Sequence, residues 1–207
     1  TVGALGVGAA ISTSNADSRC APSADELLAP TWDQARAEGM QAAFQAPGTD
    51  TTTRAATRVR DGLDRFASQW ADARTTACES ATTTRRNVAL QCLDQRLIHF
   101  EALVDALEDS DEKALQYAEE AVGRLGDPVQ CTQPDWTQSA LREPPAEQAE
   151  AVASVRRQLA RVNADANLGK FDAALKAVLP LSEHTEAIGF DPLTAEALNE
   201  AGLLHLR

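Results

Sequence analysis

Two runs of apolar residues at helical spacing constrain the fold of this 207-residue chain more than any other feature. The first run is Val59, Leu63, Phe66, Trp70, Ala73 and Ala77. The second run is Leu90, Leu93, Leu97, Phe100, Val104 and Leu107. Steps of three and four residues place each run along one face of an α-helix. Because a short polar segment separates the runs, we expect a hairpin of two antiparallel helices whose apolar faces meet.

Further helices are expected on both sides of this hairpin. Ser23 is placed to cap a helix over 24–44. A shorter helix carries Leu115, Ala118, Val122 and Leu125 and would close the hairpin into a bundle. Aromatic residues make up only 4% of the chain, so its core must consist mainly of alanine and leucine. Alanine is the strongest helix former, and we therefore predict an all-α fold.

The C-terminal part carries a helix-turn-helix pattern. After an apolar run that ends at Ala166, residues 168–175 read LGKFDAAL. Gly169 permits a tight turn, Phe171 can wedge between paired helices, and Ala174 allows a close helix crossing. This pattern resembles a tetratricopeptide repeat. Residues 197–204, with Ala201 and Gly202 at the small-residue crossing, resemble the first helix of a next repeat. The resemblance implies the start of a tetratricopeptide-like helical array.

The chain divides into four segments on these patterns. Residues 1–11 are uncharged and small or apolar, so we interpret 1–19 as the end of a transmembrane or signal segment with its exit linker. A helical bundle domain with cysteines is expected over 20–128. The proline-containing residues 129–146 are expected to be a linker, and 147–207 the repeat region. The net charge of −12 repels phosphate backbones, so we do not expect nucleic acid as a partner.

The four cysteines favour disulfides over a metal site, because none lies in a CxxC pair or at ligand spacing to a histidine. Three connectivities are possible. We expect Cys78 to pair with Cys92 across the hairpin turn, which leaves Cys20 for Cys131. Four buried free thiols are the alternative. Disulfides would indicate an oxidising compartment.

We find no pattern for catalysis, a cofactor or a metal. His99, His184 and His205 stand alone, and the chain has neither an HExxH nor a GxSxG motif. Asp94 and Arg96, with Glu79 on the facing helix, are expected to form an ion-pair or hydrogen-bond network with a structural role. A ligand pocket around Arg96 is the functional alternative.

The order of several motifs resembles one bacterial arrangement. These motifs are Cys20, Trp32, Phe44, Trp70, the ACE triplet 77–79, the QCLDQRL stretch 91–97 and Cys131, ahead of a repeat. The chain is similar to the segment that follows the transmembrane helix in myxobacterial serine/threonine protein kinases with C-terminal tetratricopeptide repeats. The resemblance implies an extracytoplasmic, membrane-anchored segment with the kinase domain upstream; no kinase motif occurs here.

We therefore expect a non-catalytic sensor or a module that binds a protein or peptide. In tetratricopeptide-like arrays the first helices of the repeats face the partner. Asn163, Asn167 and Asn199 lie on such helices and are our candidate partner-binding residues. The alternative is a structural spacer or oligomerisation segment between the membrane and the repeats.

Overall fold

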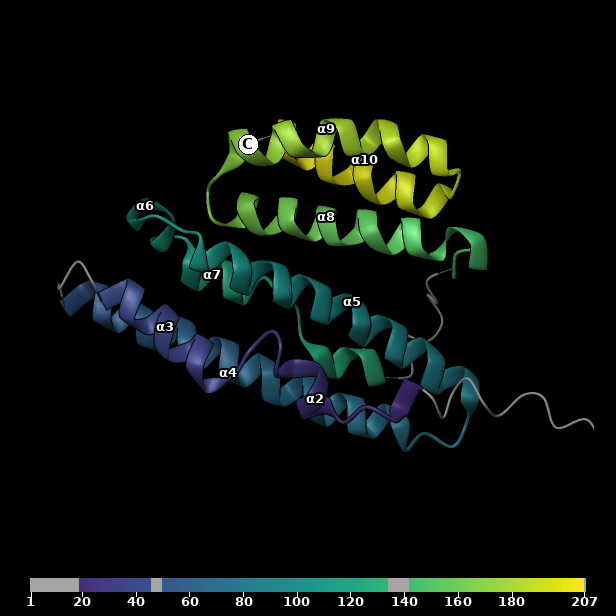
Figure 1. Ribbon diagram of the computed structural model, residues 1–207, viewed down its shortest axis with the longest axis horizontal. Helices are drawn as coiled ribbons and strands as arrows, with labels where there is room; N and C mark the ends of the chain where they lie inside the picture. Colours follow the sequence, from purple (N-terminus) through teal and green to yellow (C-terminus); the bar gives the residue numbers. More distant parts are fainter. Residues whose placement is uncertain (1–18, 46–49, 134–141, 207) are drawn as a thin grey trace, which may run out of the picture.

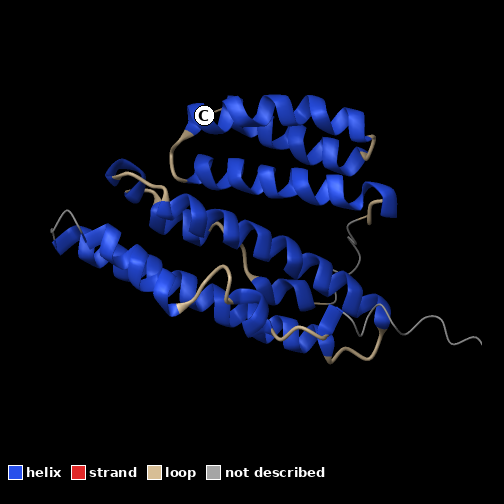
Figure 2. Cartoon of the chain, viewed as in Figure 1, coloured by secondary structure: helices blue, strands red, loops and turns tan. Residues whose placement is uncertain are grey.

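The computed structural model describes residues 19–45, 50–133 and 142–206. The predicted membrane-proximal segment 1–18 and part of the predicted linker, 134–141, lie outside the described residues. The described residues form helices and loops without a strand (Figure 2), which confirms the all-α prediction. In chain order the elements are α2 (Ala24–Leu28), α3 (Gln34–Gln45), α4 (Asp50–Cys78), α5 (Thr83–Glu108), α6 (Glu112–Leu115), α7 (Ala118–Gly123), the 3₁₀ helices η1 (Pro128–Thr132) and η3 (Ala146–Gln148), α8 (Ala149–Asn167), α9 (Phe171–Ile188) and α10 (Asp191–His205).

Helices α4 and α5 form the expected antiparallel hairpin (Figure 1). All six residues of the first apolar run are buried, and so is every residue of the second except the half-buried Leu97. The rings of Phe66 and Phe100 stack with centroids 4.7 Å apart. Trp70 donates its indole N–H to the carbonyl of Leu93 at 2.8 Å. The facing apolar stripes therefore make the core of the hairpin, as the spacing predicts.

Helix α5 is buried on a second face as well. Ala102, Leu103 and Ala106 join a core that also contains Ala160 and Ala164 of α8. Figure 1 shows α5 between the α3–α4 layer and α8, with α9 and α10 stacked beyond α8. The predicted bundle and the predicted repeat region thus share a packed surface through α5 and α8.

Two helices expected to be continuous are broken. The helix expected over 24–44 divides into α2 and α3, because Pro30 lacks an N–H and its ring clashes with the preceding turn. Ser23 does cap α2, in a capping box with Glu26. The helix expected near residues 115–125 divides into α6 and α7 at Tyr117, whose ring lies against the turn at Gly169.

Helices α8, α9 and α10 enclose a second apolar core. The predicted stripe on α8 is fully buried, with Val152, Val155, Leu159, Val162 and Ala166 each at most 8% exposed. Gly169 makes the turn into α9 with φ +78°, Phe171 packs at the edge of this core, and Ala174 is inaccessible to solvent. Gly202 is exposed on α10 with no described atom within 4 Å of its Cβ position, whereas Ala201 beside it is buried in this core.

The cysteines form two disulfides, Cys20–Cys78 and Cys92–Cys131. The expected pairing of Cys78 with Cys92 is wrong. Cys78 ends α4, but Cys92 lies nine residues into α5, which at 1.5 Å per residue is about 14 Å from the turn. A disulfide requires Cα atoms within about 7 Å of each other. The bonds instead fasten the segment before α2 to α4, and η1 to α5.

Candidate functional site

A cavity of about 360 Å³ lies between α5, α8 and α10. Helix α5 contributes Cys92, Gln95, Arg96 and His99 to its walls, α8 contributes Arg156, Leu159 and Asn163, and α10 contributes Glu196, Asn199 and Glu200. Three of these side chains, on three helices, are amides that can both donate and accept hydrogen bonds. We call this space the α5–α8–α10 cavity.

A smaller cavity of about 210 Å³ adjoins it between α5, α7 and α8. Arg96, His99 and Asn163 line both spaces. The other lining residues are Leu103, Ala121, Arg124, Leu125, Ala164 and Asn167. We call this space the α5–α7–α8 cavity. Because the two share three side chains, they form adjoining parts of one site.

Hydrogen bonds connect the polar side chains across the helices. Arg124 donates to Oδ1 of Asn167 at 3.0 Å, and Asn167 donates to Oδ1 of Asn163 at 2.9 Å. Asn163 in turn donates to Oε1 of Glu200 at 3.2 Å. This series runs from α7 through α8 to α10, so the amides are held in fixed orientations.

A bidentate ion pair fixes α8 to α10 at the edge of the site. Arg156 donates to both carboxylate oxygens of Glu196, at 2.6 and 3.0 Å. The Arg156 side chain is 8% exposed, whereas that of Glu196 is 35% exposed. Planar two-point pairing of this kind is strong and directional. It holds the walls of the α5–α8–α10 cavity in register.

His99 and Arg96 lie side by side along α5 and are both half-buried. Burial lowers the pKa of His99 below its ordinary value of 6.5; the positive charge of Arg96 lowers it further and Glu196 opposes the shift. The imidazole is therefore neutral at pH 7. Burial also lowers the pKa of Arg96, opposed by Asp127, and Arg96 contacts the carbonyl oxygen of Leu125 at 3.4 Å.

The structure brings together the three candidate asparagines and Arg96. Asn163 and Asn199 line the α5–α8–α10 cavity, and Asn163 and Asn167 line the α5–α7–α8 cavity. Arg96 lines both, although the pattern around it favoured a structural role. The charged pair of Arg156 and Glu196 was missed. Its one sequence signal is that Arg156 follows Val155 on the apolar stripe of α8, where an arginine must be buried and paired.

The network expected among Glu79, Asp94 and Arg96 is not formed. Residues two apart on a helix point to opposite sides, so Asp94 and Arg96 cannot share a partner. Asp94 instead binds Arg19 at 2.6 Å. Glu79 is exposed beside the hairpin turn and lines a different pocket.

A second arginine lies near Asp94. Arg74 reaches it at 3.9 Å, donates to the carbonyl of Arg19, and lies 5.5 Å from the centre of the Trp70 ring. Arg74 is buried, and this burial lowers its pKa. These contacts surround the Cys20–Cys78 disulfide and fasten the N-terminal segment to the hairpin.

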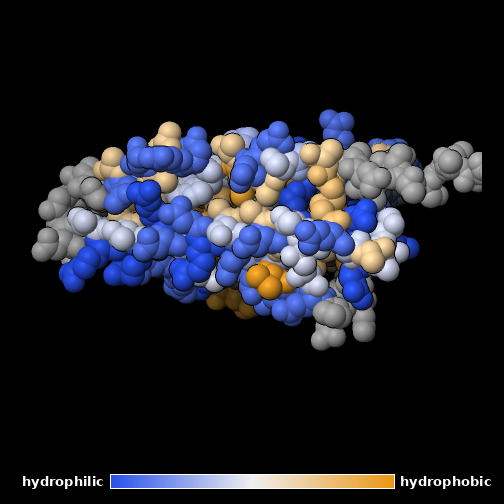
Figure 3. All heavy atoms as spheres, turned by 90° about the horizontal axis from the view of Figure 1, so that it is seen from below, coloured by the Kyte–Doolittle hydropathy of each residue, from blue (hydrophilic) through white to orange (hydrophobic). Residues whose placement is uncertain are grey.

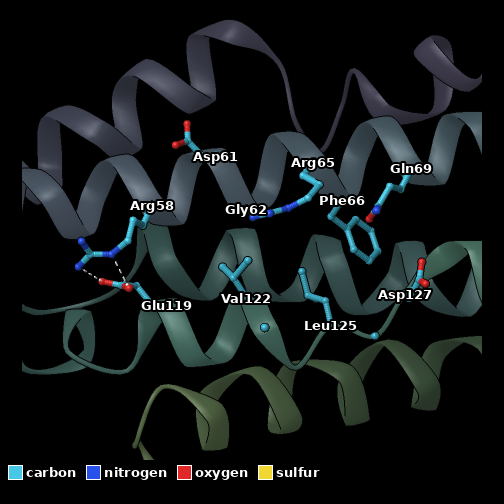
Figure 4. Close-up of a pocket in the computed structure, with 12 residues that line it drawn as sticks. Arg58, Asp61, Gly62, Arg65, Phe66, Gln69, Glu119, Val122, Leu125 and Asp127 are labelled. Carbon is cyan, nitrogen blue, oxygen red and sulfur yellow. Dashed lines mark hydrogen bonds and ion pairs between the residues drawn. The ribbon is translucent and has the colours of Figure 1, made fainter.

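A further hollow, of about 680 Å³, lies between α4 and α7 (Figure 4). Arg58 and Glu119 close one end with two hydrogen bonds of 2.6 Å, and Asp127 lies at the other end. Phe66 and Val122 form part of its apolar wall. Asp127 is occupied as the cap of η1, where it accepts from the N–H of Val129. The charged side chains at its two ends are thus engaged with protein groups.

The remaining surface gives few further candidates. Viewed from the side of α3 and α4, the molecule is covered mainly by hydrophilic side chains, with apolar ones in small groups (Figure 3). Within 19–45, 50–133 and 142–206, no cluster of three or more histidine, cysteine or acidic side chains is placed to hold a metal ion. Across the same ranges no helix combines the length and apolar character needed to cross a bilayer.

Comparison with known proteins adds no further candidate. No protein-family model, no curated protein and no solved structure matches this chain.

Proposed function

We propose that this chain is a non-catalytic module that binds a peptide or a segment of a protein partner in the α5–α8–α10 cavity. One observation carries the proposal: Arg96, Asn163 and Asn199, which lie far apart in the sequence, line one space of about 360 Å³. Two of the three were chosen because the first helices of a repeat array face its partner.

The chemistry of the walls supports a peptide as the occupant. A peptide backbone presents N–H and C=O groups in alternation, and the amides of Gln95, Asn163 and Asn199 can satisfy either kind. The buried Leu159 offers an apolar surface beside them. The Arg156–Glu196 pair keeps the walls in place without the partner, which lowers the entropic cost of binding.

The two disulfides support an oxidising compartment for the module. Such a compartment agrees with the resemblance to the outer segment of membrane-anchored serine/threonine kinases with tetratricopeptide repeats. On this view the module is the sensing part of a signalling protein, and the stack of α8, α9 and α10 begins the repeat array.

Peptide display tests the proposal directly. The oxidised 207-residue protein would be used to select from a phage library of random short peptides, and selected peptides would be titrated by calorimetry. Asn199→Arg places a large charged side chain at the cavity and should weaken binding at least tenfold. Gln158→Arg makes the same change on the exposed side of α8, outside both cavities, and should leave binding unchanged. Peptides that bind both variants equally, or failure to select any peptide, would refute the proposal.

One observation favours a second candidate, an oligomerisation segment. Leu198, Leu203 and Leu206, on and just after α10, are 55%, 49% and 85% exposed. Exposed leucines can mark a contact between chains. Light scattering that shows a dimer for the wild type and a monomer for Leu198→Ser would support this candidate. A monomer at all concentrations would exclude it.

A further inference from the structure

The α5–α7–α8 cavity differs in charge from the rest of the protein. The chain contains 31 acidic and only 19 basic residues. Yet the lining of this cavity includes two arginines, Arg96 and Arg124, and no aspartate or glutamate. Its other polar lining residues are His99, Asn163 and Asn167. A recess of guanidinium and amide donors without a carboxylate in its wall favours a negatively charged occupant.

A carboxylate already occupies the guanidinium group of Arg124. Glu120 accepts from Nη2 of Arg124 at 2.5 Å, while Nη1 of the same guanidinium binds Asn167. The Glu120 side chain is 64% exposed, so it can leave Arg124 at little cost in burial. The pair lies one helical turn apart on α7, where such exposed pairs contribute little to stability. An external anion can therefore replace Glu120.

The other nearby carboxylates lie in neighbouring walls. Glu200, in the wall of the α5–α8–α10 cavity, accepts from Asn163 at 3.2 Å. Asp127 lines the hollow between α4 and α7, and Glu196 lines the α5–α8–α10 cavity. Glu196 is held by both nitrogens of Arg156, so it is already neutralised. Asp127 interacts electrostatically with Arg96, and Glu196 with His99. None of these carboxylates is among the residues that line the recess.

We infer that the α5–α7–α8 cavity is an oxyanion site that binds a carboxylate or a phosphate group, with Arg96 and Arg124 as the charged donors and Asn167 beside them. The group belongs to the partner held in the adjoining cavity; this identification of its carrier rests on the proposed function, but the anion site itself does not. Because Arg96, His99 and Asn163 line both spaces, a peptide in the larger one would place an acidic or phosphorylated group in the smaller one.

Nuclear magnetic resonance of the ¹⁵N-labelled 207-residue protein tests this inference with two simple probes. Inorganic phosphate and succinate would be added separately at constant ionic strength, and the side-chain signals of Asn163, Asn167 and the arginine Nε–H groups would be followed. We expect saturable shifts of these signals with at least one probe, with affinity in the millimolar range. A response to phosphate alone would indicate a phosphorylated partner, and a response to succinate alone an acidic one.

Three variants make the test specific. Arg124→Gln should weaken anion binding at least fivefold, since it removes a charged donor. Glu120→Gln should strengthen it severalfold, because the competing carboxylate is gone; this gain cannot result from misfolding. Arg157→Gln removes an equal charge from the exposed face of α8 and should change binding less than twofold.

Two results would overturn the inference: the absence of saturable shifts with either probe, or equal loss of binding in the variants at Arg124 and Arg157. Anion binding without any selected peptide would leave the oxyanion site standing and refute the proposed function. Peptide binding at the larger cavity without an anion response would refute the oxyanion site and leave the proposed function standing.

Discussion

Val122 of α7 lies directly against Gly62 of α4: a Cβ atom on residue 62 would come within 2.6 Å of Val122 Cγ1. Real Cβ atoms are not found so close to another heavy atom, so α7 can pack on α4 only because residue 62 is glycine. The valine methyl cannot easily move away, since a β-branched side chain has one strongly preferred rotamer in a helix. Both residues line the hollow between the two helices.

The contact predicts a strong coupling between the two positions. Gly62→Ala should lower the free energy of unfolding by about 1–3 kcal/mol through overpacking. In a Val122→Ala background the same change should be neutral or stabilising by up to about 1 kcal/mol, because alanine is the better helix former. Urea unfolding of the four proteins measures both values. Gly39→Ala on α3, with no atom within 4 Å of its Cβ position, is the control and should stabilise. Equal effects at residues 39 and 62 would contradict the packing argument.

The disulfide pairing predicts a defined peptide map. Digestion of the unreduced protein should yield one linked pair containing Cys20 and Cys78 and another containing Cys92 and Cys131. The bonds span 58 and 39 residues, so removing either by a double Cys→Ser change should cost about 2–4 kcal/mol of stability. Calorimetry of the two double variants measures the loss. A fragment linking Cys78 to Cys92 would show that the pairing is different.

Two glycines in left-handed turns should respond differently to alanine. Gly169 has φ +78° and a Cβ there would lie 2.6 Å from the ring of Tyr117, whereas Gly189 has φ +73° and open space around it. Gly189→Ala should cost about 1–2 kcal/mol for the backbone conformation alone. Gly169→Ala should cost about 1–3 kcal/mol more because the ring must move. Thermal unfolding would distinguish them; a smaller loss at Gly169 would show that Tyr117 does not pack there.

His99 should make stability depend on pH. Its pKa in the folded protein is lowered from 6.5. On acidification, His99 therefore binds a proton in the unfolded chain at a higher pH than in the folded protein. The free energy of unfolding should therefore fall as the pH drops below about 7, and cease to fall once the folded-state pKa is passed. His99→Gln should flatten this dependence between pH 7.5 and about 5.5, where few carboxylates titrate.

The exposed His184 on α9 provides the matched control. His184→Gln should retain the slope of the wild type between the same pH values. An unchanged slope in His99→Gln would mean that the pKa of the imidazole is the same in the folded and the unfolded protein.

The helices themselves could be predicted from the sequence, because each needs only a repeating apolar pattern that is local to the chain. The stripes from Val59 to Ala77 and from Val152 to Ala166 are buried as expected. The capping box at Ser23 is also local, and it forms. The break at Pro30 was missed even though its cause is local, because the apolar spacing continues across the proline.

The candidate site was only partly predictable. Asn163, Asn167 and Asn199 were chosen by their positions in a repeat pattern, and the structure places them on two adjoining cavities. Arg124 carries no pattern of its own, since it directly follows the short helix α7, whose Val122 packs on Gly62 of α4. A side chain that enters a site from another part of the chain leaves no periodic signal.

The sequence by itself determined the helical class of this protein, the positions of its main apolar faces and the turn at Gly169, because these depend on residues within a few positions of one another. Only the tertiary structure decided which cysteines pair, since α5 carries Cys92 about 14 Å from the turn that ends α4. It also decided that Asp94 forms an ion pair with Arg19 and that Arg96 lines the α5–α8–α10 cavity. These outcomes depend on how each helix is rotated about its axis and packed on its neighbours. Contacts between residues far apart in the sequence establish that arrangement.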